Sequence, residues 1–219
     1  MEHGVVSKPE AVTPRERYRA QVQEEIKRHA WEQIASAGAS ALSLNAIAKQ
    51  IGMSGPALYR YFVNRDELIT ELIRDAYRSL ADTFRTRAEA GADLAGLAHA
   101  LRDWALADPQ RYFLLYGTPV PGYHAPEDTT RITAEIMSVL LDACADGPLT
   151  AVPTSPLEAR LAEHLAWAGR HPEATSRRAL AFWTRLHGVL SLELAGHFTG
   201  MGFDPAHLYA AEVATLTGR

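Results

Sequence analysis

A short stretch near the N-terminus concentrates side chains that suit contact with a nucleic acid. Gly55 and Pro56 carry little side chain, so the first turn of a helix that begins there can approach a duplex closely. The free N–H groups and the positive dipole end of that turn would then point toward phosphate. The hydroxyls of Tyr59 and Tyr61 suit phosphate oxygens, and Arg60 suits a phosphate or the edge of a guanine. These residue types predict a DNA-contacting surface.

Two short helices joined by a tight turn would position this surface. Ser43 can cap the first helix, which ends near Ile51, and Gly52 supplies the positive φ that a turn this short requires. The second helix is expected to begin at Ser54 and to end around Phe62. Apolar residues on both helices have a spacing that lets them pack at a steep angle: Ala46, Ile47, Ile51 and Leu58. This is the helix-turn-helix plan, which presents its second helix to the major groove of DNA.

The same stretch resembles the N-terminal DNA-binding domain of TetR-type transcriptional repressors. The residues that carry the resemblance are IA at 47–48, G at 52, LYRYF at 58–62 and NRDEL at 64–68. The resemblance covers about residues 14–68. The chain departs from the family at Arg65, where lysine is usual, and at Gly55, where some relatives carry a polar residue.

The resemblance also implies which residues contact DNA. Ser43 and Asn45 would touch a phosphate or a base edge, although Ser43 also has a role as an N-cap. Arg65 would lie on the DNA backbone, and five residues would lie at the groove: Gly55, Pro56, Tyr59, Arg60 and Tyr61. An isolated helix-turn-helix also occurs in proteins that bind no DNA. In that reading Tyr59 would belong to the protein core, as we expect of Leu58 and Phe62 in either case.

Helix signals dominate the rest of the chain, and strand signals are scarce. Of the 219 residues, 47% are hydrophobic and 22% are charged, which is typical of a folded protein. N-caps, first-turn prolines and terminal glycines predict an all-α fold of about nine to ten helices, and the expected caps include Thr13 with Glu16 and Asn64 with Glu67. The expected helices span residues 14–37, 43–51, 54–62, 65–90, 92–107, 109–116, 127–145, 156–169 and 173–198, with a last one from 205. The expected domains are a disordered tail at 1–12, a helix-turn-helix domain at 13–65, and an effector-binding and dimerisation domain at 66–219.

Charge is unevenly distributed along the chain. The net charge is −4 overall, but residues 1–65 carry 9 Lys and Arg against 6 Asp and Glu. A basic head on an acidic body suggests that the head binds a polyanion. The single cysteine, Cys144, fits a reducing compartment, and neither a signal peptide nor a membrane span is apparent. The cytoplasm is therefore the expected location.

The helix expected at 173–198 is apolar on more than one side. Such a helix must be buried on two sides, one against the subunit's own core and the other against a second subunit. Together with the helix at 156–169, it would form a four-helix dimer interface. The residues expected at that interface are Leu186, Leu190 and Leu194.

Aromatic residues of the C-terminal part are candidates for an effector site. The candidates are Trp104, Tyr112, Tyr116, Trp183 and His187, since apolar pockets with a few polar tips are typical of small-molecule sites. For each aromatic residue the alternative is an ordinary core position, and for His187 it is a hydrogen-bonded core histidine. The pattern from Trp183 through His187 to Gly188, like residues 108–128, resembles the regulatory domain of one TetR subgroup.

No catalytic or metal-binding motif is recognisable, so we expect no cofactor, no metal and no enzyme activity. The resemblance implies a regulator that binds a palindromic operator as a homodimer and represses transcription. A small apolar or amphipathic effector would release it by changing the separation of the two reading heads. The competing class is an all-α ligand-binding or protein-interaction module whose DNA-binding head is vestigial.

Overall fold

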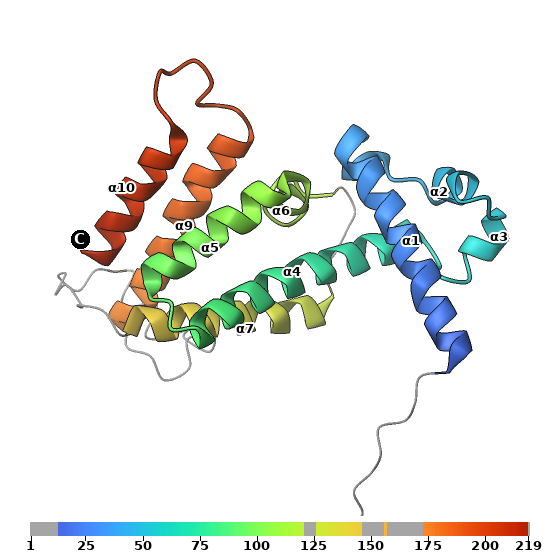
Figure 1. The fold of residues 1–219 in the computed structure, drawn as a ribbon, viewed down its shortest axis with the longest axis horizontal. Coiled ribbons are helices and arrows are strands. Elements are labelled where there is room, and N and C mark those ends of the chain that lie inside the picture. The colour runs from blue at the N-terminus through green and yellow to red at the C-terminus, as the bar shows by residue number, and fades with distance from the viewer. Residues whose placement is uncertain (1–12, 121–125, 146–155, 157–172, 219) are drawn as a thin grey trace, which may run out of the picture. The chain divides into compact units, whose positions relative to one another are not determined.

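The fold is helical throughout the part of the chain that the structure describes (Figure 1). A computed structural model describes residues 13–120, 126–145, 156 and 173–218. Its regular elements are nine α-helices and one 3₁₀ helix within these residues, with no strand among them, which confirms the all-α prediction. The chain forms two compact units, residues 1–69 and residues 70–219.

The first unit is built from four helical elements. These are α1 (Pro14–Ala37), η1 (Ala39–Ala41), α2 (Leu44–Gln50) and α3 (Gly55–Leu58). The Thr13 hydroxyl accepts the Glu16 N–H at 3.3 Å, and the Glu16 carboxylate accepts the Thr13 N–H at 2.8 Å, so a reciprocal capping box begins α1. The buried side of α1 consists of Val22, Ile26, Ala30 and Ile34.

The remaining helices, apart from the start of α4, belong to the second unit. They are α4 (Arg65–Glu89), α5 (Leu94–Ala107), α6 (Pro109–Tyr116), α7 (Glu127–Ala145), α9 (Glu173–Leu194) and α10 (Pro205–Thr217). The division between the units falls within α4, after Ile69. The expected tail at 1–12 and, apart from residue 156, the expected helix at 156–169 lie outside the described residues.

Two helices end earlier than the sequence suggested. α3 is a single turn that ends at Leu58, and the next residues continue as hydrogen-bonded turns in which the Tyr61 N–H donates to the Leu58 carbonyl at 2.8 Å. α9 ends at Leu194 because Gly196 takes a φ of 76°, a conformation that favours glycine. The expected span of 173–198 was therefore wrong at its C-terminal end.

α9 lies at the centre of the second unit, in contact with α5, α6, α7 and α10 (Figure 1). Its side chains Phe182, Leu186 and Leu190 are fully buried in the core that these helices share. Near the N-terminus of α9, Arg178 donates hydrogen bonds to the carbonyl of Leu216 on α10 and to that of Cys144 on α7. A guanidinium at two helix C-termini satisfies carbonyls that have no partner within their helices.

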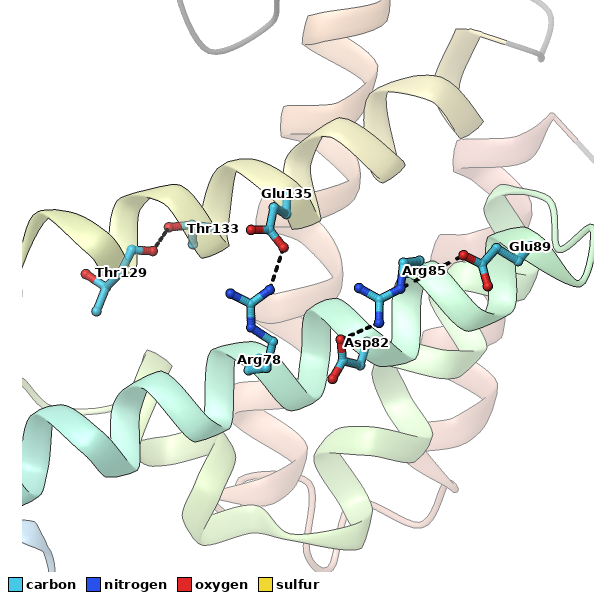
Figure 2. A network of polar contacts seen from close by, with 7 residues as sticks. All are labelled: Arg78, Asp82, Arg85, Glu89, Thr129, Thr133 and Glu135. Atoms are coloured by element: carbon cyan, nitrogen blue, oxygen red, sulfur yellow. Dashed lines mark hydrogen bonds and ion pairs between the residues drawn. The ribbon is translucent and has the colours of Figure 1, made fainter. Parts of the chain in front are cut away.

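α4 and α7 are joined by an exposed ion pair (Figure 2). Arg78 on α4 donates to the Glu135 carboxylate on α7 at 2.6 Å, while Arg85 pairs with Asp82 within α4. Both members of the pair between α4 and α7 are 41% exposed, so it contributes at most about 1 kcal/mol to stability. The apolar core, and not this surface, holds the second unit together.

A search of the described helices finds none that is both long and apolar enough to cross a bilayer. The same residues contain no group of three or more His, Cys, Asp or Glu side chains that could hold a metal ion.

Candidate functional site

The short helix α3 and the turn that follows it, residues 55–62, bury one side and expose the other. Leu58 is 0% exposed and Phe62 is 2% exposed, which confirms both as core residues. On the opposite side Tyr59 is 42% exposed, and Pro56 and Arg60 are exposed as well. The structure therefore presents the predicted side chains outward on a fixed scaffold.

The turn between α2 and α3 brings Asn45 beside the start of α3. Gly52 has a φ of 68°, as the sequence predicts, and the Met53 N–H closes the turn on the Ala48 carbonyl at 2.8 Å. A Cβ placed on Gly55 would lie 3.4 Å from the side-chain oxygen of Asn45. This is an ordinary van der Waals distance, so the exposed Asn45 lies next to the first turn of α3 and a small side chain at position 55 would also fit there.

Two of the predicted contact residues also have structural roles. The Ser43 hydroxyl accepts the Ala46 N–H at 3.3 Å and so caps α2. Arg65 donates to the Ala39 carbonyl at 2.8 Å, which joins the start of α4 to η1, and its side chain keeps 30% exposure. Both residues are partly exposed and can reach a ligand, but each also makes a hydrogen bond that stabilises the first unit.

α1 supplies basic residues that the sequence analysis missed. The Arg19 guanidinium donates to the Arg60 carbonyl at 3.2 Å and lies 5.5 Å from the centre of the Tyr61 ring. Within the preceding turn of α1, Arg15 and Arg17 are exposed and have no ion pair within the described part of the chain. The signal was the basic run PRERYR at 14–19, which extends the positive surface beside α3.

The start of α4 confirms a predicted capping pair. The Asn64 side chain accepts the Glu67 N–H at 2.8 Å, and the Glu67 carboxylate accepts the Val63 N–H. These bonds satisfy free N–H groups where the chain leaves the turn after α3. They therefore help to fix the direction in which that turn presents Tyr59 and Arg60.

In the second unit, four of the five effector candidates lie together. Tyr112 and Tyr116 come from α6, and Trp183 and His187 come from α9. The His187 ring lies 4.3 Å from Tyr116, 4.4 Å from Trp183 and 5.6 Å from Tyr112, measured between ring centres. We call these four residues the α6–α9 aromatic cluster.

Trp104 has a separate, structural role. It is 5% exposed, its indole N–H donates to the Ser79 hydroxyl at 3.1 Å, and the Arg111 guanidinium lies 4.6 Å from its ring centre. No ring contact joins Trp104 to the α6–α9 aromatic cluster among the described residues. The core alternative raised for Trp104 is therefore the better description of its surroundings.

Hydrogen bonding in the α6–α9 aromatic cluster is incomplete. The Tyr112 hydroxyl lies 3.0 Å from Nδ1 of His187, 2.9 Å from the Ser191 hydroxyl and 3.2 Å from the His187 carbonyl. In contrast, Nε2 of His187 and the Tyr116 hydroxyl are buried and have no hydrogen-bond partner in the described structure. His187 thus resembles a core histidine on one side of its ring only.

The α6–α9 aromatic cluster is uncharged near pH 7. Burial lowers the pKa of His187 to about 4, and burial also raises the pKa of Tyr112 above its ordinary value. The pKa of Tyr116 is raised by burial and further by its tyrosine neighbours, Tyr77 and Tyr112. Desolvation disfavours the charged form of each group, so the cluster offers neutral hydrogen-bonding groups set among aromatic rings.

The expected dimer interface needs correction. Leu186 and Leu190 are both 0% exposed within a single chain, so they have no surface left to offer a second subunit. Leu194 is partly buried against the same core. The exposed positions of α9 form a different stripe: Thr184, Gly188 and Leu192 are spaced by four residues, and Arg185 is exposed beside Thr184.

Comparison with known proteins identifies both parts of the chain. Residues 26–72 match a family described as bacterial regulatory proteins, tetR family, and residues 94–216 match a family described as tetracyclin repressor-like, C-terminal domain. The HTH-type transcriptional regulator Rv1816 of Mycobacterium tuberculosis is 35% identical over 216 residues, which cover 90% of this chain and 92% of that protein. The matched families and this relative are transcriptional regulators and not enzymes.

Solved structures agree with this fold. A crystal structure described as that of a regulatory protein, SCO4313, is 68% identical, with a TM-score of 0.88, and the match covers 94% of this chain and 100% of that one. A transcriptional regulator of the TetR/AcrR family from Thermobifida fusca has a TM-score of 0.59 at 17% identity, over 90% of this chain and 97% of its own. The second similarity supports the fold alone.

Proposed function

Because this chain belongs to the TetR family of transcriptional regulators, we propose that it represses transcription by binding a palindromic operator as a homodimer. A small molecule that binds the second unit would release it from that operator. In this proposal residues 13–65 bind DNA, and residues 66–219 bind the effector and form the dimer. Because its partner is operator DNA, the protein would act in the cytoplasm.

The observation that carries the proposal is the two-sided character of α3. Leu58 on α3 and Phe62 in the turn that follows it are buried, whereas Tyr59 and Arg60 of that turn are exposed beside the helix that would enter the major groove. The remaining proposed contacts lie on the neighbouring elements or in the same turn: Ser43, Asn45, Gly55, Pro56, Tyr61 and Arg65. Phosphate contacts would come mainly from hydroxyls and guanidiniums, and base contacts from Arg60 and Asn45.

The arginines of α1 extend this surface. Arg19 is bound to the Arg60 carbonyl, so the N-terminal turns of α1 lie beside α3 within the same unit. Arg15 and Arg17 would then reach phosphates that flank the groove occupied by α3. Each such contact releases counterions from DNA, so the affinity should depend strongly on salt.

A homodimer would give the surface its specificity. A single turn of helix reads few base pairs, whereas a two-fold dimer presents two copies to half-sites about 34–36 Å apart on a palindrome. The exposed stripe of α9 that contains Leu192 supports a self-complementary contact, since Leu192 is 45% exposed. It replaces the interface first expected at Leu186 and Leu190.

The α6–α9 aromatic cluster is the proposed effector site. It combines aromatic rings with buried polar atoms that have no partner, which is the composition of small-molecule sites. The contact of Trp183 with His187 also supports a place in the TetR subgroup with the Trp-x-x-x-His-Gly pattern. Release requires only that the effector bind more tightly to the form that cannot bind DNA, and a coupling of about 1–3 kcal/mol is typical.

Selection of duplexes from a random pool tests the proposal. The full-length protein should enrich a palindrome, and an electrophoretic shift with that duplex should report one dimer per site. Enrichment of no sequence, or binding by single subunits, would contradict it. In that case the second class of protein considered above, a ligand-binding module with an unused head, would be the better account.

A further inference from the structure

The strongest unexplained feature outside the DNA-binding surface is a pair of buried polar atoms in the α6–α9 aromatic cluster. The Tyr116 hydroxyl and Nε2 of His187 each lack a hydrogen-bond partner in the described structure, and their rings lie 4.3 Å apart. Buried polar groups are nearly always paired in native proteins, because an unpaired one is destabilising. Two such atoms on adjacent rings indicate a place where a bound molecule completes the hydrogen bonding.

The surroundings of these two atoms are aromatic. Trp183 lies edge-on to Tyr116, with ring centres 5.9 Å apart, and Tyr77 lies edge-on to it from α4 at 6.3 Å. Tyr112 completes the group, with its ring 5.3 Å from that of Tyr116. Rings that meet at such angles offer both faces and edges to a flat apolar molecule.

Among the residues that the structure describes, no hydrogen bond or ion pair directs a charged side chain at these two atoms. Arg111, which comes from the same helix as Tyr116, is turned to Trp104 and Ser79. The groups that act electrostatically on Tyr116 are Tyr77 and Tyr112, and burial alone accounts for the lowered pKa of His187. An ionised ligand would therefore be buried here without a counter-charge, which is strongly unfavourable.

We infer that the α6–α9 aromatic cluster binds an uncharged aromatic or alicyclic alcohol, whose hydroxyl pairs with the Tyr116 hydroxyl and with Nε2 of His187. A hydroxyl can both donate and accept, so it matches either neutral tautomer of His187 while Tyr112 occupies Nδ1. The inference rests on the proposed effector role of this cluster and adds the chemical class of the effector. A carboxylate or an amine of the same shape would be rejected.

Three probes of one shape test the class: 1-naphthol, naphthalene and 1-naphthoate, each titrated calorimetrically into the full-length protein at pH 7. We expect 1-naphthol to bind about tenfold more tightly than naphthalene, the effect of one or two net hydrogen bonds. We expect 1-naphthoate to bind more weakly than either. Binding of 1-naphthoate as tight as that of 1-naphthol, or no binding of 1-naphthol at millimolar concentration, would overturn the inference.

Variants test whether the preference for 1-naphthol over naphthalene depends on the Tyr116 hydroxyl and Nε2 of His187. Tyr116→Phe removes only the hydroxyl, so it should reduce the preference for 1-naphthol over naphthalene to about threefold or less and leave naphthalene binding unchanged. His187→Phe should act in the same direction. Tyr18→Phe, at a tyrosine that is 64% exposed on α1, should leave the preference at about tenfold. A Tyr116→Phe protein that folds and keeps the full preference would refute the assignment.

The outcome for DNA is separable from the outcome for the ligand. If 1-naphthol binds with the predicted preference but leaves operator affinity unchanged, the proposed release fails and the ligand class stands. If the operator is bound and none of the probes binds, the ligand class fails and the proposed DNA-binding function stands.

Discussion

The Arg19 guanidinium lies 3.2 Å from the main-chain oxygen of Arg60, a residue 41 positions later in the chain. This bond ties the first turns of α1 to the end of the turn that follows α3. It gives the DNA-binding surface proposed above a second element, which sequence patterns confined to the helix-turn-helix do not reveal. Its removal should therefore affect DNA affinity without affecting the fold of either unit.

We expect Arg19→Ala to weaken operator binding about three- to tenfold, since one hydrogen bond and one cation–ring contact are lost beside the reading helix. Fluorescence anisotropy with a labelled operator would measure the change. Arg28→Ala is the matched control, because Arg28 lies on the same helix but pairs with Glu32. Equal losses in the two variants would show that the contact with Arg60 has no special role.

Arg15→Gln combined with Arg17→Gln should flatten the salt dependence of operator binding. Each phosphate contact adds about 0.9 to the slope of log affinity against log salt concentration, so the slope should fall by nearly 2 in the double variant. The control removes two exposed arginines of α4, Arg85 and Arg87. A slope that stays at the wild-type value in the Arg15/Arg17 variant would exclude phosphate contacts from this part of α1.

Leu192→Asp should produce a monomer that retains its helix content, because Leu192 is 45% exposed within one chain. Leu190→Asp should instead reduce helix content, because a carboxylate would be buried in the subunit core without a partner. Light scattering and circular dichroism distinguish the two results. Leu106→Asp, at a leucine 39% exposed on α5, should remain dimeric. A dimer mass for Leu192→Asp would place the interface elsewhere.

His187 should make the protein less stable as the pH falls. Its pKa in the folded protein is about 4, below the ordinary value of about 6.5. Between these values the unfolded chain binds the proton and the folded chain does not. The free energy of unfolding should therefore decrease as the pH falls through this window, with a slope that approaches about 1.4 kcal/mol per pH unit.

Urea denaturation of the wild type and of His187→Gln across that pH window separates the effect of His187 on the free energy of unfolding from that of the carboxylates. The carboxylates titrate in both proteins, so their effect cancels in the comparison. The free energy of unfolding of the wild type minus that of His187→Gln should decrease steadily from pH 6.5 toward pH 4. A constant difference would show that His187 is protonated in the folded state as readily as in the unfolded one.

Local sequence signals predicted the helices well, whereas the residues of the interface and of the candidate sites depend on tertiary packing. Thr13 with Glu16 and Asn64 with Glu67 form the predicted caps because a capping pair acts over three residues. By contrast, a helix that is apolar on every side does not reveal which side faces its own core. Leu190 was therefore assigned to the interface, although it is buried and Leu192 is exposed.

The candidate sites show the same limit. The exposed residues of α3 could be predicted because their types are unusual for a short helix, and the buried partners Leu58 and Phe62 followed from spacing. Composition grouped Trp104 with the other aromatics, but only tertiary contacts separate it from Tyr116 and His187. The long-range contact of Arg19 with Arg60 has no local signature either.

The central claim is that the exposed residues of α3 and of the turn that follows it read an operator, and one titration tests it most directly. Anisotropy should be measured at low salt with the selected palindrome and with a scrambled duplex, for the wild type and for Tyr59→Ala. We expect the wild type to prefer the palindrome by about a thousandfold, and Tyr59→Ala to lose most of that preference while its dimer mass and helix content are unchanged. Equal affinity of the wild type for both duplexes, or an unchanged preference in Tyr59→Ala, would contradict the claim.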